Sequence, residues 1–127
     1  QIFTQNSIHY SRTGRTENRS KPDFLFPSQS SYQDAGFDPS RLLMLGVKST
    51  CKDRWRQVLA EADRIPEKHL LTLEAPISKH QTDEMRVKSL TLVIPTPLQS
   101  SFKPEQRVEL ISVREFIALA RARQTQG

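Results

Sequence analysis

The feature that most constrains the fold is one stretch in which an apolar run passes directly into an amphipathic pattern, LLMLGVKSTCKDRWRQVLAEADR (Leu42–Arg64). The apolar part, Leu42–Val47, predicts a buried strand. Thr50 and Asp53 have the spacing of a capping box, which predicts a helix start. Beyond it, apolar residues recur at helical spacing, namely Trp55, Val58, Leu59 and Ala62. We therefore expect a core strand followed by a helix that packs on its sheet.

Further apolar runs predict strands elsewhere in the chain, at Lys21–Pro27, His69–Leu73 and Leu90–Ile94. In the first of these, Phe24 and Phe26 should face away from Asp23 and Leu25, because successive side chains of a strand alternate. The residues that follow, Ser28–Ser40, are rich in polar and turn-forming residues and are predicted to be a polar loop.

Capping boxes predict helices in the second half of the chain. Ser78 with Gln81 opens a helix that should extend to about Ser89, and Ser112 with Glu115 opens the last one. The last helix has an apolar stripe, namely Val113, Phe116, Ile117 and Ala120. The predicted order is strand, strand, helix, strand, helix, strand, helix. This alternation predicts an α/β fold of three layers, with a mixed central sheet flanked by helices.

Composition limits the possible environments and partners. The 127 residues fit one domain, and the content of 35% hydrophobic and 26% charged residues is that of a globular chain. No apolar run approaches the roughly 20 residues that a bilayer span needs, so we expect no membrane segment. The lone cysteine, Cys51, excludes an internal disulfide and favours a cytoplasmic location. The net charge of +5 favours polyanionic partners.

Three residues have the chemistry of metal-assisted phosphodiester hydrolysis: Asp23, Lys48 and Glu61. Two carboxylates can hold a hard Mg²⁺ ion, and a lysine can orient water or offset negative charge on the phosphate. Spacing alone leaves another interpretation open. Asp23 can cap a turn, Lys48 can be an exposed strand end, and Glu61 can pair with Arg64 or Gln57 on a solvated helix face.

Other reactive residues form weaker candidates. His9, His69 and His80 lack the spacing and acidic partners of a zinc site, so we expect them at the surface or at strand ends. Cys51 follows a predicted helix start, a setting that lowers a thiol pKa, but without a neighbouring histidine it is interpreted as incidental. Trp55 is expected in the core or in the wall of a binding cleft.

Several segments carry a resemblance to a known family: KPDFLFPS (21–28), MLGVKSTCKDRWRQVLAEADRI (44–65) and KHLLTLEAPIS (68–78). They resemble the catalytic domain of EcoRII-type type II restriction endonucleases, a branch of the PD-(D/E)XK nuclease superfamily. The resemblance implies a restriction-endonuclease-like fold in which Asp23 and Glu61 ligate Mg²⁺ and Lys48 is the active-site lysine. Gly46 stands where the commonest motif has an acidic residue, and Glu61 matches the position from which this branch supplies the missing carboxylate.

The resemblance also implies residues that support catalysis and read the DNA sequence. Tyr32 and Lys52 match positions near the family's active site. Lys52, Asp53 and Arg54 resemble a segment that reads the outer G·C pairs of CC…GG sites. Lysine and arginine can donate to guanine, and aspartate can accept from cytosine. The implied partners are double-stranded DNA and a second copy of the chain.

The chain departs from the family in its first part. Nothing corresponds to the N-terminal DNA-binding effector domain, or to the helices that precede the first motif. We therefore expect residues 1–127 to form a single, truncated nuclease domain that lacks the N-terminal helices. The leading hypothesis is a Mg²⁺-dependent, sequence-specific double-stranded DNA endonuclease of the restriction type. The alternatives are a DNA-binding module that does not cut and a DNA-repair nuclease of the same fold.

Overall fold

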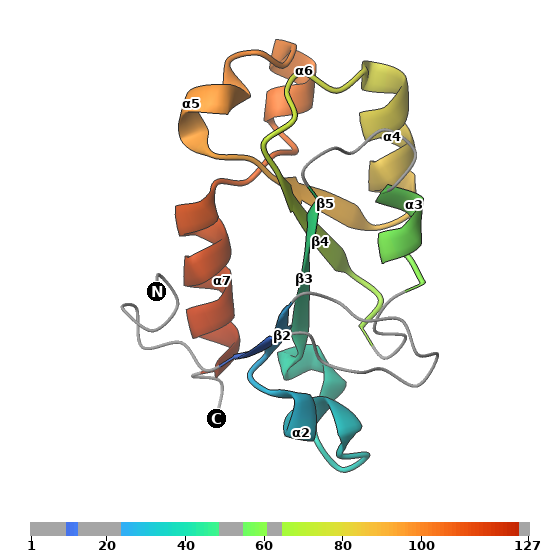
Figure 1. Cartoon of the computed structure of the whole chain (residues 1–127), viewed down its shortest axis with the longest axis vertical. Coiled ribbons are helices and arrows are strands. Elements are labelled where there is room, and N and C mark those ends of the chain that lie inside the picture. Colours follow the sequence, from blue (N-terminus) through green and yellow to red (C-terminus); the bar gives the residue numbers. More distant parts are fainter. Residues whose placement is uncertain (1–9, 13–23, 49–54, 61–64, 125–127) are drawn as a thin grey trace.

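The computed structural model describes residues 10–12, 24–48, 55–60 and 65–124 (Figure 1). The strands are β1 (Ser11–Arg12), β2 (Phe24–Phe26), β3 (Leu43–Lys48), β4 (Lys68–Thr72) and β5 (Leu90–Val93). The helices are α2 (Gln29–Gln33), α3 (Trp55–Val58), α4 (Lys79–Val87), α5 (Thr96–Gln99), α6 (Pro104–Arg107) and α7 (Val113–Gln124), with a 3-10 turn η1 (Pro39–Arg41). None of these helices has the length and apolar composition needed to cross a membrane.

The strands form one mixed sheet in the order β1-β2-β3-β4-β5. β2 pairs antiparallel with both β1 and β3, whereas β3, β4 and β5 are parallel. Figure 1 shows α7 on one side of the sheet and α3 with α4 on the other. The prediction of a three-layer α/β fold with a mixed central sheet is thus confirmed.

Alternation along the strands divides the core into two clusters. In β3, Leu43 and Leu45 belong to the cluster beneath α7, whereas Met44 belongs to the cluster beneath α3 and α4. In β2, Phe26 belongs to the cluster beneath α7, and Leu25 belongs to the cluster beneath α3 and α4. The alternation predicted for residues 24–26 is therefore confirmed, and Asp23 lies outside the described residues.

Among the described helices, α7 covers one face of the sheet, and it does so with the predicted stripe. Phe116 and Ile117 are buried in it, and the Phe116 ring meets the ring of Phe26 edge-on, with centroids 5.4 Å apart. The capping box at its start is complete. The Glu115 N–H donates to Ser112 Oγ at 3.0 Å, and the Ser112 N–H donates to Glu115 Oε1 at 2.8 Å.

Short helices cover the other face, and polar bonds tie them together. The N–H of Gln81 donates to Ser78 Oγ at 3.3 Å, which confirms Ser78 as the cap of α4. Within the described part of the chain, Gln81 Oε1 is buried and accepts no hydrogen bond, so the predicted box is only half formed. Gln106 of α6 donates to the Ile77 carbonyl at 2.9 Å and to Thr82 Oγ1 at 3.0 Å. These bonds fix α6 against α4.

The prediction of a polar loop over Ser28–Ser40 is wrong, because that segment contains α2 and η1. Ser28 Oγ accepts a hydrogen bond from the Ser31 N–H at 3.1 Å, at the start of α2. Tyr32 is 1% exposed and packs in the cluster beneath α3 and α4. Helix caps and buried contacts hold this segment. Because neither produces a long periodic pattern of apolar residues in the sequence, the helix was not predicted.

Other predicted boundaries change in detail. Residues 95–111, for which no helix was predicted, contain α5 and α6. The strand predicted at His69–Leu73 is β4, Lys68–Thr72, and Leu73 lies beyond it with 67% of its surface exposed. Of the helix predicted to begin near Thr50, the described part is α3, whose Trp55 and Val58 are buried as predicted. Thr50, Asp53 and Ala62 lie outside the described residues.

The end of α7 is joined to η1 by reciprocal bonds. Arg41 donates from Nε to the Arg123 carbonyl at 3.3 Å and from Nη2 to the Gln124 carbonyl at 3.1 Å. In return, Arg123 Nη1 donates to the Ser40 carbonyl at 2.7 Å. The last carbonyls of a helix lack partners within the helix, and Arg41 binds two carbonyls in the last described turn of α7.

Candidate active site

Lys48 is the last residue of β3 and pairs in parallel register with Thr72, the last residue of β4. In the same register Leu71 pairs with Val93, so the carboxyl ends of β3, β4 and β5 lie at one edge of the sheet. Open α/β sheets bind their ligands in the crevice outside the carboxyl ends of the strands. The structure therefore places the predicted lysine where such a fold binds ligands.

The immediate surroundings of Lys48 combine a buried hydroxyl with exposed apolar groups. Thr72 is buried, and its Oγ1 accepts a hydrogen bond from the Glu74 N–H at 3.1 Å. Val47 and Leu73 are exposed at this edge. Within the described ranges, no three His, Cys, Asp or Glu side chains gather closely enough to hold a metal ion. Asp23 and Glu61, the predicted metal ligands, lie outside the described residues, so their predicted role stays a prediction.

Tyr32, also predicted near the active site, lies in α2. Figure 1 shows α2 beside the end of the sheet where β3 begins, whereas Lys48 ends β3. The described structure therefore places Tyr32 and Lys48 toward opposite ends of β3. Lys52, Asp53 and Arg54 lie outside the described residues, immediately before α3.

α3 itself is anchored on both its buried and its exposed side. Trp55 is fully buried, which confirms its predicted place in the core. The guanidinium of Arg56 lies over the Trp55 ring, 4.5 Å from the ring centroid, and its Nη2 contacts Glu84 Oε1 of α4 at 2.7 Å. Sequence reasoning missed this pair, because the two charges are 28 positions apart and neither belongs to a local motif.

His69 is a buried titratable group, which corrects the prediction of a surface or strand-end position. It lies inside β4, and its ring meets Phe116 edge-on with centroids 5.2 Å apart. Burial, with a smaller contribution from the positive charge of Arg123, lowers the pKa of His69 from 6.5 to about 4. The ring is therefore neutral at physiological pH, and among the described residues its Nδ1 has no hydrogen-bond partner.

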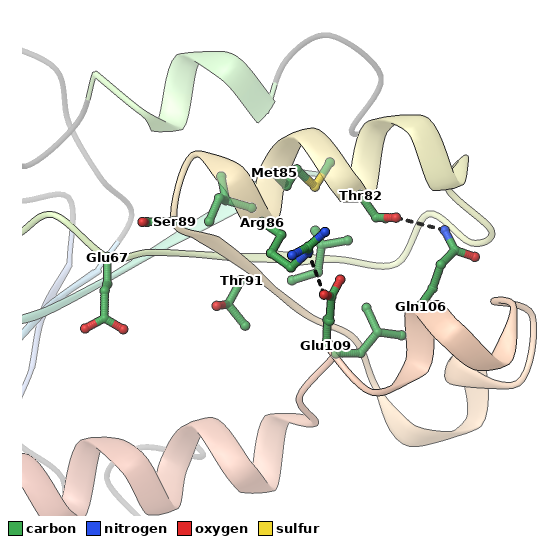
Figure 2. Close-up of a pocket in the computed structure, with 11 residues that line it drawn as sticks. Glu67, Thr82, Met85, Arg86, Ser89, Thr91, Gln106 and Glu109 are labelled. Atoms are coloured by element: carbon green, nitrogen blue, oxygen red, sulfur yellow. Dashed lines mark hydrogen bonds and ion pairs between the residues drawn. The ribbon is translucent and has the colours of Figure 1, made fainter.

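A cavity of about 280 Å³ lies between α4, β5 and α6 (Figure 2). Ser89 and Leu90 place it beside the amino end of β5, away from the strand end that neighbours Lys48. Figure 2 shows Arg86 and Glu109 reaching toward each other across it, with Arg86 Nε 2.7 Å from Glu109 Oε1. Arg86 and Glu109 are thus paired with each other, and the cavity is separate from the candidate active site.

Comparisons with known proteins identify the family of this chain. A model of the EcoRII C-terminal family matches residues 1–117. The type II restriction enzyme EcoRII of Escherichia coli is 46% identical over 118 residues, which cover 92% of this chain and 29% of that protein. This chain thus spans less than a third of that relative.

Solved structures of Ecl18kI have the same fold. One, metal-depleted Ecl18kI in complex with uncleaved DNA, matches with a TM-score of 0.77 and 18% identity, covering 96% of this chain and 41% of that chain. Another, with uncleaved, modified DNA, matches with a TM-score of 0.73 and 16% identity over the same shares. The predicted restriction-endonuclease-like fold is thereby confirmed, and the chain belongs to the EcoRII C-terminal family.

Proposed function

We propose that this chain is the catalytic domain of a Mg²⁺-dependent type II restriction endonuclease. It hydrolyses phosphodiester bonds of double-stranded DNA at CC…GG-type sites such as CCWGG. The observation that carries the proposal is the position of Lys48 at the carboxyl end of β3, in a chain of the EcoRII C-terminal family. The likeness to Ecl18kI bound to DNA supports it at the level of the fold.

Asp23 and Glu61 are the proposed ligands of Mg²⁺, which binds carboxylate oxygens and, when bound, polarises the phosphate and lowers the pKa of a coordinated water. The Lys48 ammonium orients the attacking water and offsets negative charge that develops on the phosphate. The described structure supports this grouping through β2. Phe24, which follows Asp23 in sequence, pairs with Leu45 of the strand that Lys48 ends. Tyr32 and Lys52 remain proposed contributors.

Lys52, Asp53 and Arg54 are proposed to read the outer base pairs of the site. Trp55, which follows them in sequence, is fully buried. A palindromic site is matched by two-fold symmetry, so the active species is proposed to be a homodimer. A cytoplasmic location fits a protein that acts on DNA.

The test is to incubate the protein with Mg²⁺ and an unmethylated duplex carrying CCWGG, and to map the ends. The expected result is cleavage at that sequence only, with a scrambled duplex as the control. Ends at mismatches or branches would instead identify a repair nuclease. Discriminating binding without cleavage would identify a DNA-binding module.

Variants test the proposed roles. Lys48→Ala, Asp23→Ala and Glu61→Ala should lose most cleavage and still bind the duplex when Ca²⁺ replaces Mg²⁺. Asp23→Ala and Glu61→Ala should bind as tightly as the parent or more tightly, because each change relieves repulsion of the phosphate. Near-parental cleavage by any of these variants would remove that residue from the proposed site.

A further inference from the structure

The cavity between α4, β5 and α6 is lined partly by apolar and partly by polar side chains (Figure 2). The buried part of its lining is an apolar wall, formed by Met85, Leu90, Leu92 and Leu110. Its volume of about 280 Å³ lies just below the range of about 300–1,000 Å³ in which drug-sized ligands bind. The cavity is therefore large enough for a small organic molecule with an apolar part.

Three oxygen-bearing side chains line the cavity where β4 and β5 begin. Glu67 comes directly before β4, Ser89 comes directly before β5, and Thr91 lies in β5. The Lys68 N–H donates to the Ser89 carbonyl at 2.9 Å, which holds the starts of the two strands together. Figure 2 shows the three side chains on the side of the cavity away from Gln106. One side of the cavity thus carries a carboxylate and two hydroxyls.

These three side chains can accept hydrogen bonds from a ligand. The hydroxyls of Ser89 and Thr91 make no hydrogen bond with any residue that the structure describes. The side chain of Glu67 is 64% exposed, and its Oε1 lies 3.8 Å from Arg123 Nη2. A charge-assisted hydrogen bond between nitrogen and oxygen is about 2.7–2.9 Å long, so this contact leaves the Glu67 oxygens able to accept.

The polar groups on the other side of the cavity already have partners. Arg86 Nε lies 2.7 Å from Glu109 Oε1. Gln106 donates to Thr82 Oγ1 at 3.0 Å. The charged side chains of the lining are therefore one neutralised pair and the carboxylate of Glu67. An anion would have to break the pair or approach Glu67, so the charges favour a cation.

We propose that this cavity binds a primary alkylammonium ion, whose three N–H groups donate to Glu67, Ser89 and Thr91. An ammonium group has three donors and no acceptor, which matches these three acceptors. The alkyl chain lies against the apolar wall and is removed from water there. The ammonium group belongs either to a free aliphatic amine or to the lysine side chain of a partner protein, and the test below distinguishes these sources. The site is separate from Lys48 and does not depend on the proposed cleavage of DNA.

The test is a titration of the isotope-labelled protein with butylammonium chloride, without DNA and at constant ionic strength. The backbone amide signals of residues 89–92 and 109–110 should shift along one saturating curve. The melting temperature should rise with the amine concentration, because the ligand binds only the folded state. Butyrate, which has a similar length and the opposite charge, should cause neither change. No saturable shift with butylammonium, or an equal response to butyrate, would overturn the proposal.

The length of the alkyl chain tests the apolar wall. From methylammonium to butylammonium, affinity should rise by up to about fourfold for each added methylene. Equal affinities along this series would indicate a site for charge alone and would overturn the proposed binding mode. Tighter binding of butylammonium than of N-acetyl-lysine amide supports a free amine as the ligand, and the reverse order supports the lysine of a partner.

Two variants test the acceptors, and a third is the control. Glu67→Gln keeps the length of the side chain but removes the charge, and should weaken butylammonium binding about tenfold or more. Thr91→Val removes only the hydroxyl and should weaken binding by about two- to tenfold. Glu105→Gln, at an exposed position of α6 that does not line the cavity, should bind as the parent does. Parental affinity in Glu67→Gln, or an equal loss in Glu105→Gln, would overturn the proposal while the proposed function stands.

Discussion

The two faces of the sheet are built in different ways. One is covered by α7, a helix of 12 residues with a complete capping box and a buried apolar stripe. The other is covered by short helices, of which α5 and α6 have four residues each, and by α3, whose described part is Trp55–Val58. Side-chain hydrogen bonds and ion pairs link several of these, including Gln106 to Thr82 and Arg56 to Glu84. The long capped helix is held to the sheet mainly by burial of its stripe, whereas polar contacts add to burial in holding the short helices.

This difference separates stability from the proposed function. The segment proposed to read DNA leads into α3, on the face of short helices. The positions of the helices on that face can be changed through single polar contacts, each of which contributes little to stability. The contacts of α7 with the sheet are apolar and shared among neighbouring side chains, and its polar bonds to η1 lie at its end. The following variants test the contrast, from the largest expected effect to the smallest.

Phe116→Ala should have the largest effect on stability. Its ring contacts both Phe26 and His69, so truncation leaves a cavity at the centre of the α7 face. The expected loss is about 3–5 kcal/mol in the free energy of unfolding, measured by urea denaturation. Leu119→Ala, at a partly buried position on the same helix, is the control. A Phe116→Ala loss no larger than that of the control would show that α7 does not depend on its central contact.

Acid should weaken the same face through His69. The unfolded chain takes up a proton near pH 6.5, but the folded protein does so only near pH 4. Above pH 6.5 the His69 ring is neutral in both the folded and the unfolded state, so this group does not change the free energy of unfolding there. Between pH 6.5 and 4 protonation favours the unfolded state, so stability falls as pH falls, by about 3 kcal/mol in total, and below that range this group causes no further loss.

His69→Leu tests this assignment, because it should remove that part of the pH dependence. The measurement is the free energy of unfolding of the parent and the variant at several pH values between 7 and 4. His80→Gln, at an exposed position on α4, is the control and should follow the parent. A His69→Leu curve parallel to that of the parent would refute the role of this histidine.

Gln106→Met tests the polar ties of the opposite face. The change keeps the length of the side chain but leaves the Ile77 carbonyl and the Lys103 N–H without their present partner. The expected loss is about 1–3 kcal/mol in the free energy of unfolding. Gln99→Met removes one bond, to the Ile94 carbonyl at 2.9 Å, and should cost less. Equal losses would indicate that the Gln106 bonds do not act together.

The two helix caps should show the smallest and most direct contrast. Ser112→Ala breaks a reciprocal box and should cost about 1 kcal/mol, whereas Ser78→Ala breaks a single 3.3 Å bond and should cost about 0.5 kcal/mol. Chemical denaturation of both variants in parallel measures the difference. Equal losses, or a greater loss at Ser78, would contradict the link between cap geometry and stability.

The elements that the sequence predicted correctly are those with a long periodic pattern. The apolar run of β3 and the stripe of α7 repeat over enough residues to be recognised without knowing their partners. α2, α5 and α6 were missed because each is about one turn long and is held by contacts with distant residues. His69 was misplaced because a polar residue in a short strand gives no sign of which face it occupies.

The candidate site was predicted in part, for a related reason. Lys48 ends a strand that the sequence marks clearly, and parallel pairing then brings it to the edge where such sheets bind ligands. The partnership of Arg56 with Glu84 depends on how α3 lies against α4. That arrangement is a property of the folded chain, and no spacing along the sequence encodes it.

The reciprocal bonds between Arg41 and the end of α7 can form only late in the synthesis of the chain. Arg41 meets the Gln124 carbonyl 83 positions later in the chain. At about 5–20 residues per second, a ribosome needs on the order of ten seconds to deliver that partner. Until then the apolar side of β2 and β3 that packs against α7 lacks that helix. Nascent chains that stop before α7 should therefore bind chaperones or aggregate, even though every residue of the proposed active site has already been synthesised.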